Sequence, residues 1–336
     1  MGSSFSSATA SAIAHPNIAL IKYWGKASDP HFNEPAVSSL SITLDTLQTH
    51  TRLYFDSALQ KDELILNGVE NPKKLVRVSK NLDKLRTLAR CDLACRIETD
   101  NNFPTGAGLA SSASGFAALV SAGNHALKLQ LSLQQQSMLA RAMSGSAARS
   151  IEGGFVKIAL PDALEHQAHF GSAFAEQVAP PEHWPLEVCV VIVSEQEKTI
   201  GSTEGMELSR QTSPFYQSWL EGNDEDVKTA EKLVRDKDFE KLADLSEFSC
   251  LKMHAMAMAS QPGLLYWKGL TLTLMHEIRA LRASGLPVFF TVDAGPQVKA
   301  ICAPGYGDKV AECLSSLDGV KGLIRCGLGR AAKASA

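Results

Sequence analysis

Residues 104–113 read Pro104-Thr105-Gly106-Ala107-Gly108-Leu109-Ala110-Ser111-Ser112-Ala113, which places small and hydroxyl residues directly before an Ala- and Leu-rich stretch at 114–129. The apolar spacing of that stretch predicts a helix, so the segment is a glycine loop that enters a helix. Unpaired N–H groups and the helix dipole favour phosphate at such a helix start. A tight loop with a serine N-cap fits the same pattern. The spacing matches neither the Walker A motif nor a complete G-x-G-x-x-G.

Apolar runs and turn residues alternate around this loop and predict an α+β protein in two lobes. The 336 residues favour two domains, which we place at 1–190 and 191–330. We expect strands at 18–21, 40–44, 51–55, 93–97, 155–160, 186–193, 288–292, 300–302 and 322–326. We expect helices at 76–89, 114–129, 133–143, 224–258, 267–283 and 309–317.

The composition excludes several classes of protein. With 45% hydrophobic and 21% charged residues the chain resembles an ordinary globular protein, and its net charge of −3 gives no field that would hold nucleic acid. The seven cysteines show no evident pairing, and no zinc-like spacing is present. No apolar run is long enough to span a membrane, and the Ser- and Ala-rich start lacks the features of a secretory signal. We therefore expect a cytoplasmic protein without a membrane or nucleic-acid partner.

Three charged residues stand in unusual surroundings. Lys22 follows four apolar residues, which fits either an anion contact or a stem that packs while the ammonium reaches solvent. Arg149 lies in a run of small residues, where its guanidinium can clamp a carboxylate or phosphate or form a surface ion pair. Asp293 ends an apolar strand, as a base at a cleft or an Asx-turn residue does.

Taken together, these segments resemble the mevalonate diphosphate decarboxylase family of the GHMP kinase superfamily. The matching blocks are 17–26, 38–44, 102–114, 144–150 and 293–296, so they extend over most of the chain. The resemblance implies a ribosomal S5 domain 2-like N-terminal domain, a ferredoxin-like C-terminal domain and a homodimer. It also implies ATP-dependent decarboxylation of mevalonate 5-diphosphate to isopentenyl diphosphate through phosphorylation of the 3-hydroxyl group, within the mevalonate pathway.

The resemblance assigns roles to individual residues. It implies that Asp293 orients or deprotonates the hydroxyl, that Lys22 balances its charge and contacts phosphate, and that Arg149 holds the substrate carboxylate. The substrate-binding positions that it implies are Tyr23, Lys26, Arg77, Ser144, Ser146, Arg149, Ser202 and Thr203. The nucleotide-binding positions that it implies are Pro104, Gly106, Gly108, Leu109, Ala110, Ser111 and Ser112.

ATP chemistry implies Mg²⁺, whose ligands the sequence does not assign. Gln297 departs from the family, which commonly has Asn after the Asp-Ala-Gly-Pro turn. Three alternatives stay open: a decarboxylase for mevalonate 5-phosphate, a mevalonate 3-kinase or another GHMP kinase, and a binding protein without turnover. The Asp293 and Lys22 pair favours a decarboxylase.

Overall fold

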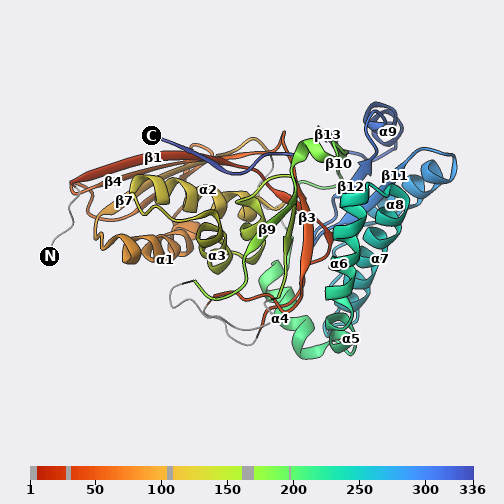
Figure 1. Cartoon of the computed structure of the whole chain (residues 1–336), viewed down its shortest axis with the longest axis horizontal. Helices are drawn as coiled ribbons and strands as arrows, with labels where there is room; N and C mark the ends of the chain where they lie inside the picture. The colour runs from red at the N-terminus through yellow and green to blue at the C-terminus, as the bar shows by residue number, and fades with distance from the viewer. Residues whose placement is uncertain (1–5, 28–31, 104–108, 161–169, 197) are drawn as a thin grey trace.

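The computed structural model describes residues 6–27, 32–103, 109–160, 170–196 and 198–336. Figure 1 shows an elongated molecule with a lobe at each end and a sheet between them. Of the predicted nucleotide-binding residues, Pro104, Gly106 and Gly108 lie outside the described residues. No helix among the described residues has both the length and the apolar character that crossing a bilayer requires.

The first lobe pairs a six-stranded sheet with three helices on one face. The sheet has the order β14-β1-β4-β7-β5-β6. Its strands are β1 (Ser7–Ala14), β4 (Thr49–Asp56), β5 (Glu63–Leu66), β6 (Val69–Glu70), β7 (Ala94–Asn101) and β14 (Lys333–Ser335). The helices are α1 (Pro72–Ala89), α2 (Ser111–Ala126) and α3 (Leu133–Met143). Because β14 pairs with β1, the last residues of the chain return to the first lobe.

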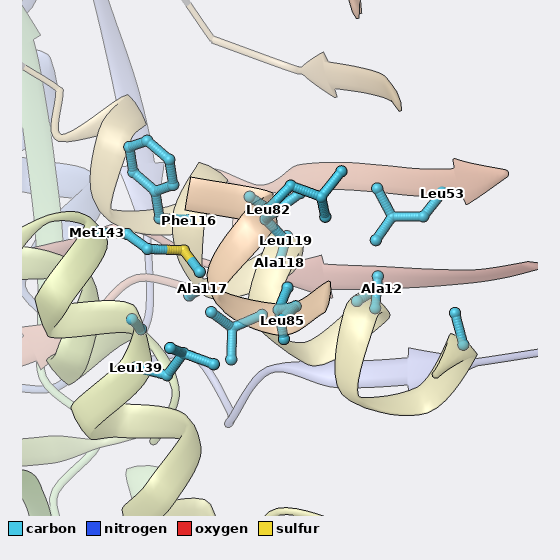
Figure 2. Packing of buried hydrophobic residues seen from close by; sticks show 14 of the residues in the cluster. Ala12, Leu53, Leu82, Leu85, Phe116, Ala117, Ala118, Leu119, Leu139 and Met143 are labelled. Carbon is cyan, nitrogen blue, oxygen red and sulfur yellow. The ribbon is translucent and has the colours of Figure 1, made fainter. Parts of the chain in front are cut away.

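A core of small and branched side chains holds these layers together. Ala12 and Leu53 on the sheet share one apolar cluster with Leu82 and Leu85 on α1, and α2 adds buried alanines to it (Figure 2). Small side chains on α2 let the helix lie close to the sheet, which fixes the position of its first turn.

The middle sheet has the order β2-β3-β8-β9. Its strands are β2 (Asn17–Ile21), β3 (Ser39–Thr43), β8 (Phe155–Ile158) and β9 (Ala175–Ala179), and a short 3₁₀ helix, η1 (Gly145–Ser150), precedes β8. Every residue of β2 and of β3 is buried. These strands are thus sandwiched between the two lobes.

The second lobe has a sheet in the order β11-β12-β10-β13 with helices against it. Its strands are β10 (Glu187–Ile192), β11 (Val288–Val292), β12 (Val298–Cys302) and β13 (Gly322–Cys326). Its helices are α4 (Ser202–Thr212), α5 (Tyr216–Leu220), α6 (Asn223–Asp236), α7 (Phe239–Met258), α8 (Gly269–Ala283) and α9 (Gly307–Ser315), and η2 (Pro181–His183) precedes β10. The domain division predicted after residue 190 falls inside β10, which pairs only within this sheet, and it stays a prediction.

One apolar cluster joins the middle sheet to the second lobe. Leu20 and Leu40 pack in the same cluster as Val190, Phe289 and Ile301. Because interiors are close-packed, this shared core holds the end of β2 and the end of β11 at a fixed separation.

The predicted helix at 224–258 is wrong as a single element. The structure divides it into α6 and α7, because Lys237 adopts a left-handed conformation and the Asp238 side chain accepts a hydrogen bond from Lys241 N as the cap of α7. The helices predicted at 76–89 and 114–129 begin earlier, at Pro72 and Ser111. Strands β1, β5, β6, β9 and β14, and helices α4 and α5, were not predicted.

Candidate active site

Lys22 directly follows β2 and is fixed from two sides. Its backbone N–H donates to Ser249 Oγ on α7 at 3.0 Å, and its side chain runs inward to Asp293. The Lys22 Nζ atom lies 2.6 Å from Asp293 Oδ1, and the lysine side chain is only 1% exposed. The lysine therefore does not reach solvent, and it makes the anion contact instead.

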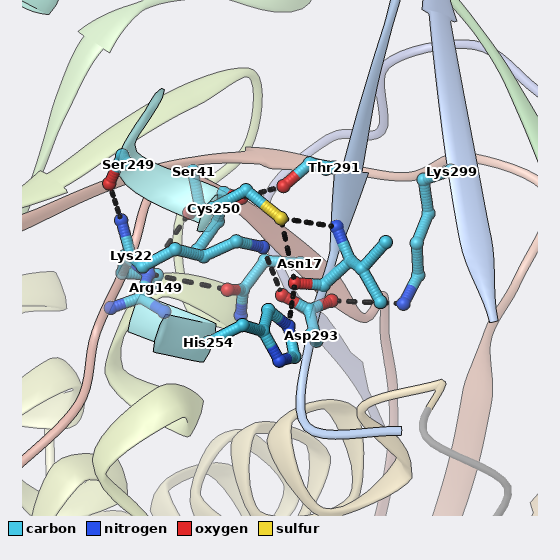
Figure 3. A network of polar contacts seen from close by, with 12 residues as sticks. Asn17, Lys22, Ser41, Arg149, Ser249, Cys250, His254, Thr291, Asp293 and Lys299 are labelled. Atoms are coloured by element: carbon cyan, nitrogen blue, oxygen red, sulfur yellow. Dashed lines mark hydrogen bonds and ion pairs between the residues drawn. The ribbon is translucent and has the colours of Figure 1, made fainter. Parts of the chain in front are cut away.

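Asp293 lies just beyond β11 and is held by two ammonium groups. Lys299 on β12 places its Nζ 3.0 Å from the other carboxylate oxygen, Oδ2 (Figure 3). Lys299 is 2% exposed, whereas the Asp293 side chain is 26% exposed. The carboxylate is thus the part of this cluster that a ligand can reach, and the two lysines lie beneath it.

This arrangement decides the charge on Asp293. Burial alone would raise the pKa of Asp293, but the ammonium groups of Lys22 and Lys299 outweigh burial and hold that pKa well below its usual range. Burial lowers the pKa of Lys299, and Lys22 adds to this effect, while Asp293 opposes it. Asp293 is therefore an ionised hydrogen-bond acceptor at neutral pH.

Arg149 lies on η1 next to this cluster (Figure 3). Its Nη1 donates to Ser39 Oγ at 2.6 Å, and its Nε donates to Ser41 Oγ at 3.1 Å and to Asn17 Oδ1 at 3.3 Å. Burial lowers the pKa of Arg149 to about 10. All three of these hydrogen-bond partners are neutral, so the positive charge of the guanidinium is available to bind an anion. Because Arg149 is buried, the alternative of a surface ion pair is ruled out.

The structure therefore brings Lys22, Asp293 and Arg149 together. Tyr23 completes this corner: the Arg149 guanidinium carbon lies 5.7 Å from the centre of its ring. Burial raises the pKa of Tyr23 to about 12, and its buried hydroxyl has no hydrogen-bond partner among the described residues. A buried hydroxyl of this kind is suited to a polar ligand.

The glycine and serines before η1 lie against Tyr23. A Cβ at Gly145 would collide with the Tyr23 hydroxyl, so Tyr23 keeps this position only beside a glycine. The Asn17 amide donates to the Ser146 carbonyl oxygen at 2.9 Å, and Ser144 and Ser146 are half-buried. These contacts fix the loop beside Arg149.

Lys26 and Arg77 form a second group of cations. Lys26 donates to Asn33 Oδ1 at 2.6 Å, and Arg77 Nη2 donates to the Met143 carbonyl oxygen at 3.3 Å, one residue before Ser144. Burial lowers the pKa of Lys26, and the Arg77 charge lowers it further. The two cations are thus close enough to interact, and a ligand with several negative charges would relieve their repulsion.

Ser202 and Thr203 lie in the first turn of α4, and Thr203 is exposed. Lys198, which the sequence analysis missed, links this turn to the site: its Nζ donates to Ser202 Oγ at 2.8 Å and to the Ala294 carbonyl oxygen at 3.0 Å. Burial lowers the pKa of Lys198, while Asp293 opposes that change. Ser202 therefore lies near the turn that carries Asp293.

Gln297 fastens the same turn to the end of β10. Its Oε1 accepts from Val193 N at 2.6 Å and from Ser194 N at 3.3 Å, and its Nε2 donates to the Ser194 carbonyl oxygen. The departure from Asn thus keeps a side chain that hydrogen-bonds main-chain groups.

Helix α2 begins beside a cavity. Ala110 is its N-cap residue, with a φ of 56° and no side-chain cap, so the serine N-cap alternative does not hold. Ser111 and Ser112 line a cavity of about 280 Å³ together with Gly115, Phe116 and Arg77, while Leu109 is buried in the core. The uncapped helix start, two hydroxyls and a partly apolar cavity fit a nucleotide.

Comparison with known proteins decides the family. Residues 14–168 match the model of the diphosphomevalonate decarboxylase-like N-terminal domain, and residues 188–319 match the mevalonate 5-diphosphate decarboxylase C-terminal domain. The diphosphomevalonate decarboxylase of Candida albicans is 35% identical over 91% of this chain and 87% of its own length. The chain belongs to the diphosphomevalonate decarboxylase family.

Solved structures of the family agree with this assignment. Mevalonate diphosphate decarboxylase from Staphylococcus aureus superposes with a TM-score of 0.90 at 36% identity, over 98% of both chains. A structure described as MDDEF in complex with MVAPP, AMPPCP and magnesium gives a TM-score of 0.89 at 36% identity, over 98% of this chain and 99% of that one. The predicted family and the predicted two-domain α+β GHMP kinase fold are confirmed.

Proposed function

We propose that this chain catalyses the ATP-dependent decarboxylation of mevalonate 5-diphosphate to isopentenyl diphosphate. The observation that carries the proposal is the buried cluster in which Lys22 and Lys299 hold the Asp293 carboxylate while Arg149 lies beside it. Bound ATP supplies the phosphoryl group that makes the tertiary 3-hydroxyl a leaving group. Relatives named diphosphomevalonate decarboxylase, at about one third identity over most of the chain, support this reaction.

Asp293 acts on the hydroxyl group of the substrate in this proposal. Its carboxylate is ionised and partly exposed, so an oxygen can accept a hydrogen bond from the 3-hydroxyl. It can take the proton as the new O–P bond forms and the bond between the γ-phosphoryl group and the departing ADP breaks. The Lys22 ammonium balances the aspartate charge from beneath the carboxylate, and at 1% exposure it offers no surface to the transferred phosphate.

Arg149 acts on the carboxylate group of the substrate in this proposal. Its guanidinium can hold the substrate carboxylate by two parallel hydrogen bonds, and its neutral partners leave its charge available for that contact. When phosphate leaves C3, the bond between C1 and C2 breaks, its electron pair forms the C2=C3 double bond, and CO2 departs. The protein's part is to orient these groups and to place charge beside them.

The diphosphate of the substrate occupies the side formed by Tyr23, Lys26, Arg77, Ser144 and Ser146, with Ser202 and Thr203 on the facing helix. The Arg77 charge lowers the pKa of Lys26, and two cations on this side favour a diphosphate over a monophosphate. A decarboxylase for mevalonate 5-phosphate is the second candidate, and it requires only one of these cations.

The nucleotide lies along the start of α2. Its phosphates face the first turn at Ser111 and Ser112, next to Ala110 and Leu109, and its base occupies the cavity that Gly115 and Phe116 line. The loop with Pro104, Gly106 and Gly108 precedes this turn.

Magnesium enters with the nucleotide in this proposal. The described residues contain no group of three His, Cys, Asp or Glu side chains that could hold the ion by themselves. The hydroxyls of Ser111 and Ser112 fit a hard cation, and Mg²⁺ commonly takes most of its ligands from phosphate and water. When bound, the ion neutralises phosphate charge.

We also propose a homodimer, a cytoplasmic location, and domains at 1–190 and 191–330. The resemblance to the family supports the dimer and the two domains. All seven cysteines are free thiols and six are buried, which supports a reducing compartment.

A coupled assay tests the function. The purified protein is incubated with ATP, Mg²⁺ and mevalonate 5-diphosphate or 5-phosphate, and ADP and CO2 are measured. The proposal predicts equal amounts of both products from the diphosphate. ADP without CO2 would indicate a 3-kinase, preference for the monophosphate would indicate the second candidate, and no ADP would indicate a binding protein.

A further inference from the structure

Lys299 is a buried charge that the reaction described above does not use. It is the second residue of β12, whose five residues are all buried, and it reaches Asp293 Oδ2 at 3.0 Å. Lys22 already neutralises Asp293 through Oδ1 at 2.6 Å. A second buried ammonium is costly unless it contributes something that the first does not.

The geometry shows what Lys299 adds. A carboxylate that one lysine holds through one oxygen can still turn about its Cβ–Cγ bond, because this torsion is broad. Ammonium groups on both oxygens remove that freedom, since a turn would break at least one contact. Each oxygen keeps further lone-pair capacity on its exposed side for the substrate hydroxyl.

We propose that Lys299 is a positioning residue for this reaction: by holding Asp293 Oδ2 it fixes the plane of the carboxylate that meets the 3-hydroxyl group. The inference rests on the proposed function. Lys299 acts through Asp293 and does not touch substrate, because it lies beneath the carboxylate and is 2% exposed.

The test is a double-mutant cycle with Lys299→Met and Asp293→Asn. In an otherwise wild-type protein we expect Lys299→Met to lower kcat for ADP release by about 10- to 100-fold, as a misplaced reacting group does. The KM for mevalonate 5-diphosphate should change by less than about threefold, because ground-state binding is kept. The Asp293→Asn protein is measured by single-turnover kinetics. Adding Lys299→Met to it should lower the rate by less than about twofold, because the carboxylate that Lys299 positions is already absent.

Lys157→Met is the matched control. Lys157 also lies on a strand, β8, and pairs with Glu231 at 2.9 Å, away from the site. We expect its kcat to stay within about twofold of wild type.

Each other result overturns the inference. A wild-type kcat in Lys299→Met would show that Lys22 alone positions Asp293, and an equal loss in both backgrounds would show a general structural role. Loss of cooperative unfolding in Lys299→Met would also show a general structural role. The remaining Lys22 and Asp293 pair is balanced in charge, so the positioning role alone predicts a folded variant. If the wild-type protein itself releases no ADP and CO2, the proposed function fails instead.

Discussion

The Lys22 ammonium and the Asp293 carboxylate meet at 2.6 Å although 271 positions separate them in the chain. Lys22 follows a strand of the middle sheet and Asp293 follows a strand of the second lobe, so the contact requires both parts to be folded and packed. The shared apolar cluster with Leu20 and Phe289 supplies that packing.

Replacing Asp293 by Asn should destabilise the protein as well as slow turnover to a rate that only single-turnover experiments follow. It leaves Lys22 and Lys299 buried side by side without their anion, which costs about 3–5 kcal/mol for a broken buried pair. Urea unfolding measures the loss. The double variant Asp293→Asn/Lys299→Met should recover part of the lost stability, because one of the two buried ammonium groups is gone. As a control, Asp226→Asn should lower the stability less, because its partner Lys252 is only partly buried. Unchanged stability in Asp293→Asn would contradict the charge cluster.

Arg149→Lys should lower kcat/KM for the substrate by about 10- to 100-fold, because a lysine cannot make the paired contact and leaves Ser39 or Ser41 without its donor. Steady-state kinetics with varied mevalonate 5-diphosphate checks this. Arg235→Lys, an exposed pair with Glu231, is the control and should behave as wild type. Normal kinetics in Arg149→Lys would return Arg149 to a structural role.

The affinity for the substrate should also fall at high pH. Burial lowers the pKa of Arg149 to about 10, so its charge is complete well below that pH and is lost as the pH rises through it. Isothermal titration between pH 7 and about pH 10.5 should show weaker binding at the alkaline end as Arg149 deprotonates. Binding that is independent of pH over this range would oppose the carboxylate contact.

Gly115→Leu should weaken ATP binding selectively. Gly115 lines the cavity at α2, and a Cβ there would meet no atom of the described residues within 4 Å, so a larger side chain would extend into the cavity. We expect the KM for ATP to rise by about tenfold or more while the helix gains stability from losing a glycine. Gly269→Leu on α8 is the control, because its Cβ also meets nothing. An unchanged KM for ATP would place the base elsewhere.

Much of the site could be predicted because its charged residues lie within or beside apolar stretches of the sequence. Lys22 after four apolar residues and Asp293 at the end of an apolar strand both gave a local signal. Lys299 has the same signal, a lysine between Val298 and Ala300, and could have been found by it. Lys198 could not, because a lysine in a polar loop is indistinguishable from a solvated one, and only the folded chain shows its contact with Ala294.

The helices and strands were predictable where the apolar spacing is regular. They were less predictable where the conformation of a single residue decides where an element ends. Strand β11 and helix α3 were predicted at their observed bounds. The break between α6 and α7 depends on the left-handed conformation of Lys237, which apolar periodicity does not reveal. Strand β14 depends on pairing with β1 at the far end of the chain, which no local pattern encodes.

The most direct test of the central claim follows one oxygen atom. Mevalonate 5-diphosphate labelled with ¹⁸O at the 3-hydroxyl is converted by the protein with ATP, and the released inorganic phosphate is analysed by mass spectrometry. If the hydroxyl is phosphorylated before CO2 is lost, the label must appear in the phosphate, with one ¹⁸O for each CO2. Unlabelled phosphate, with the ¹⁸O in water, would show that the hydroxyl leaves without phosphorylation and would contradict the role given to Asp293.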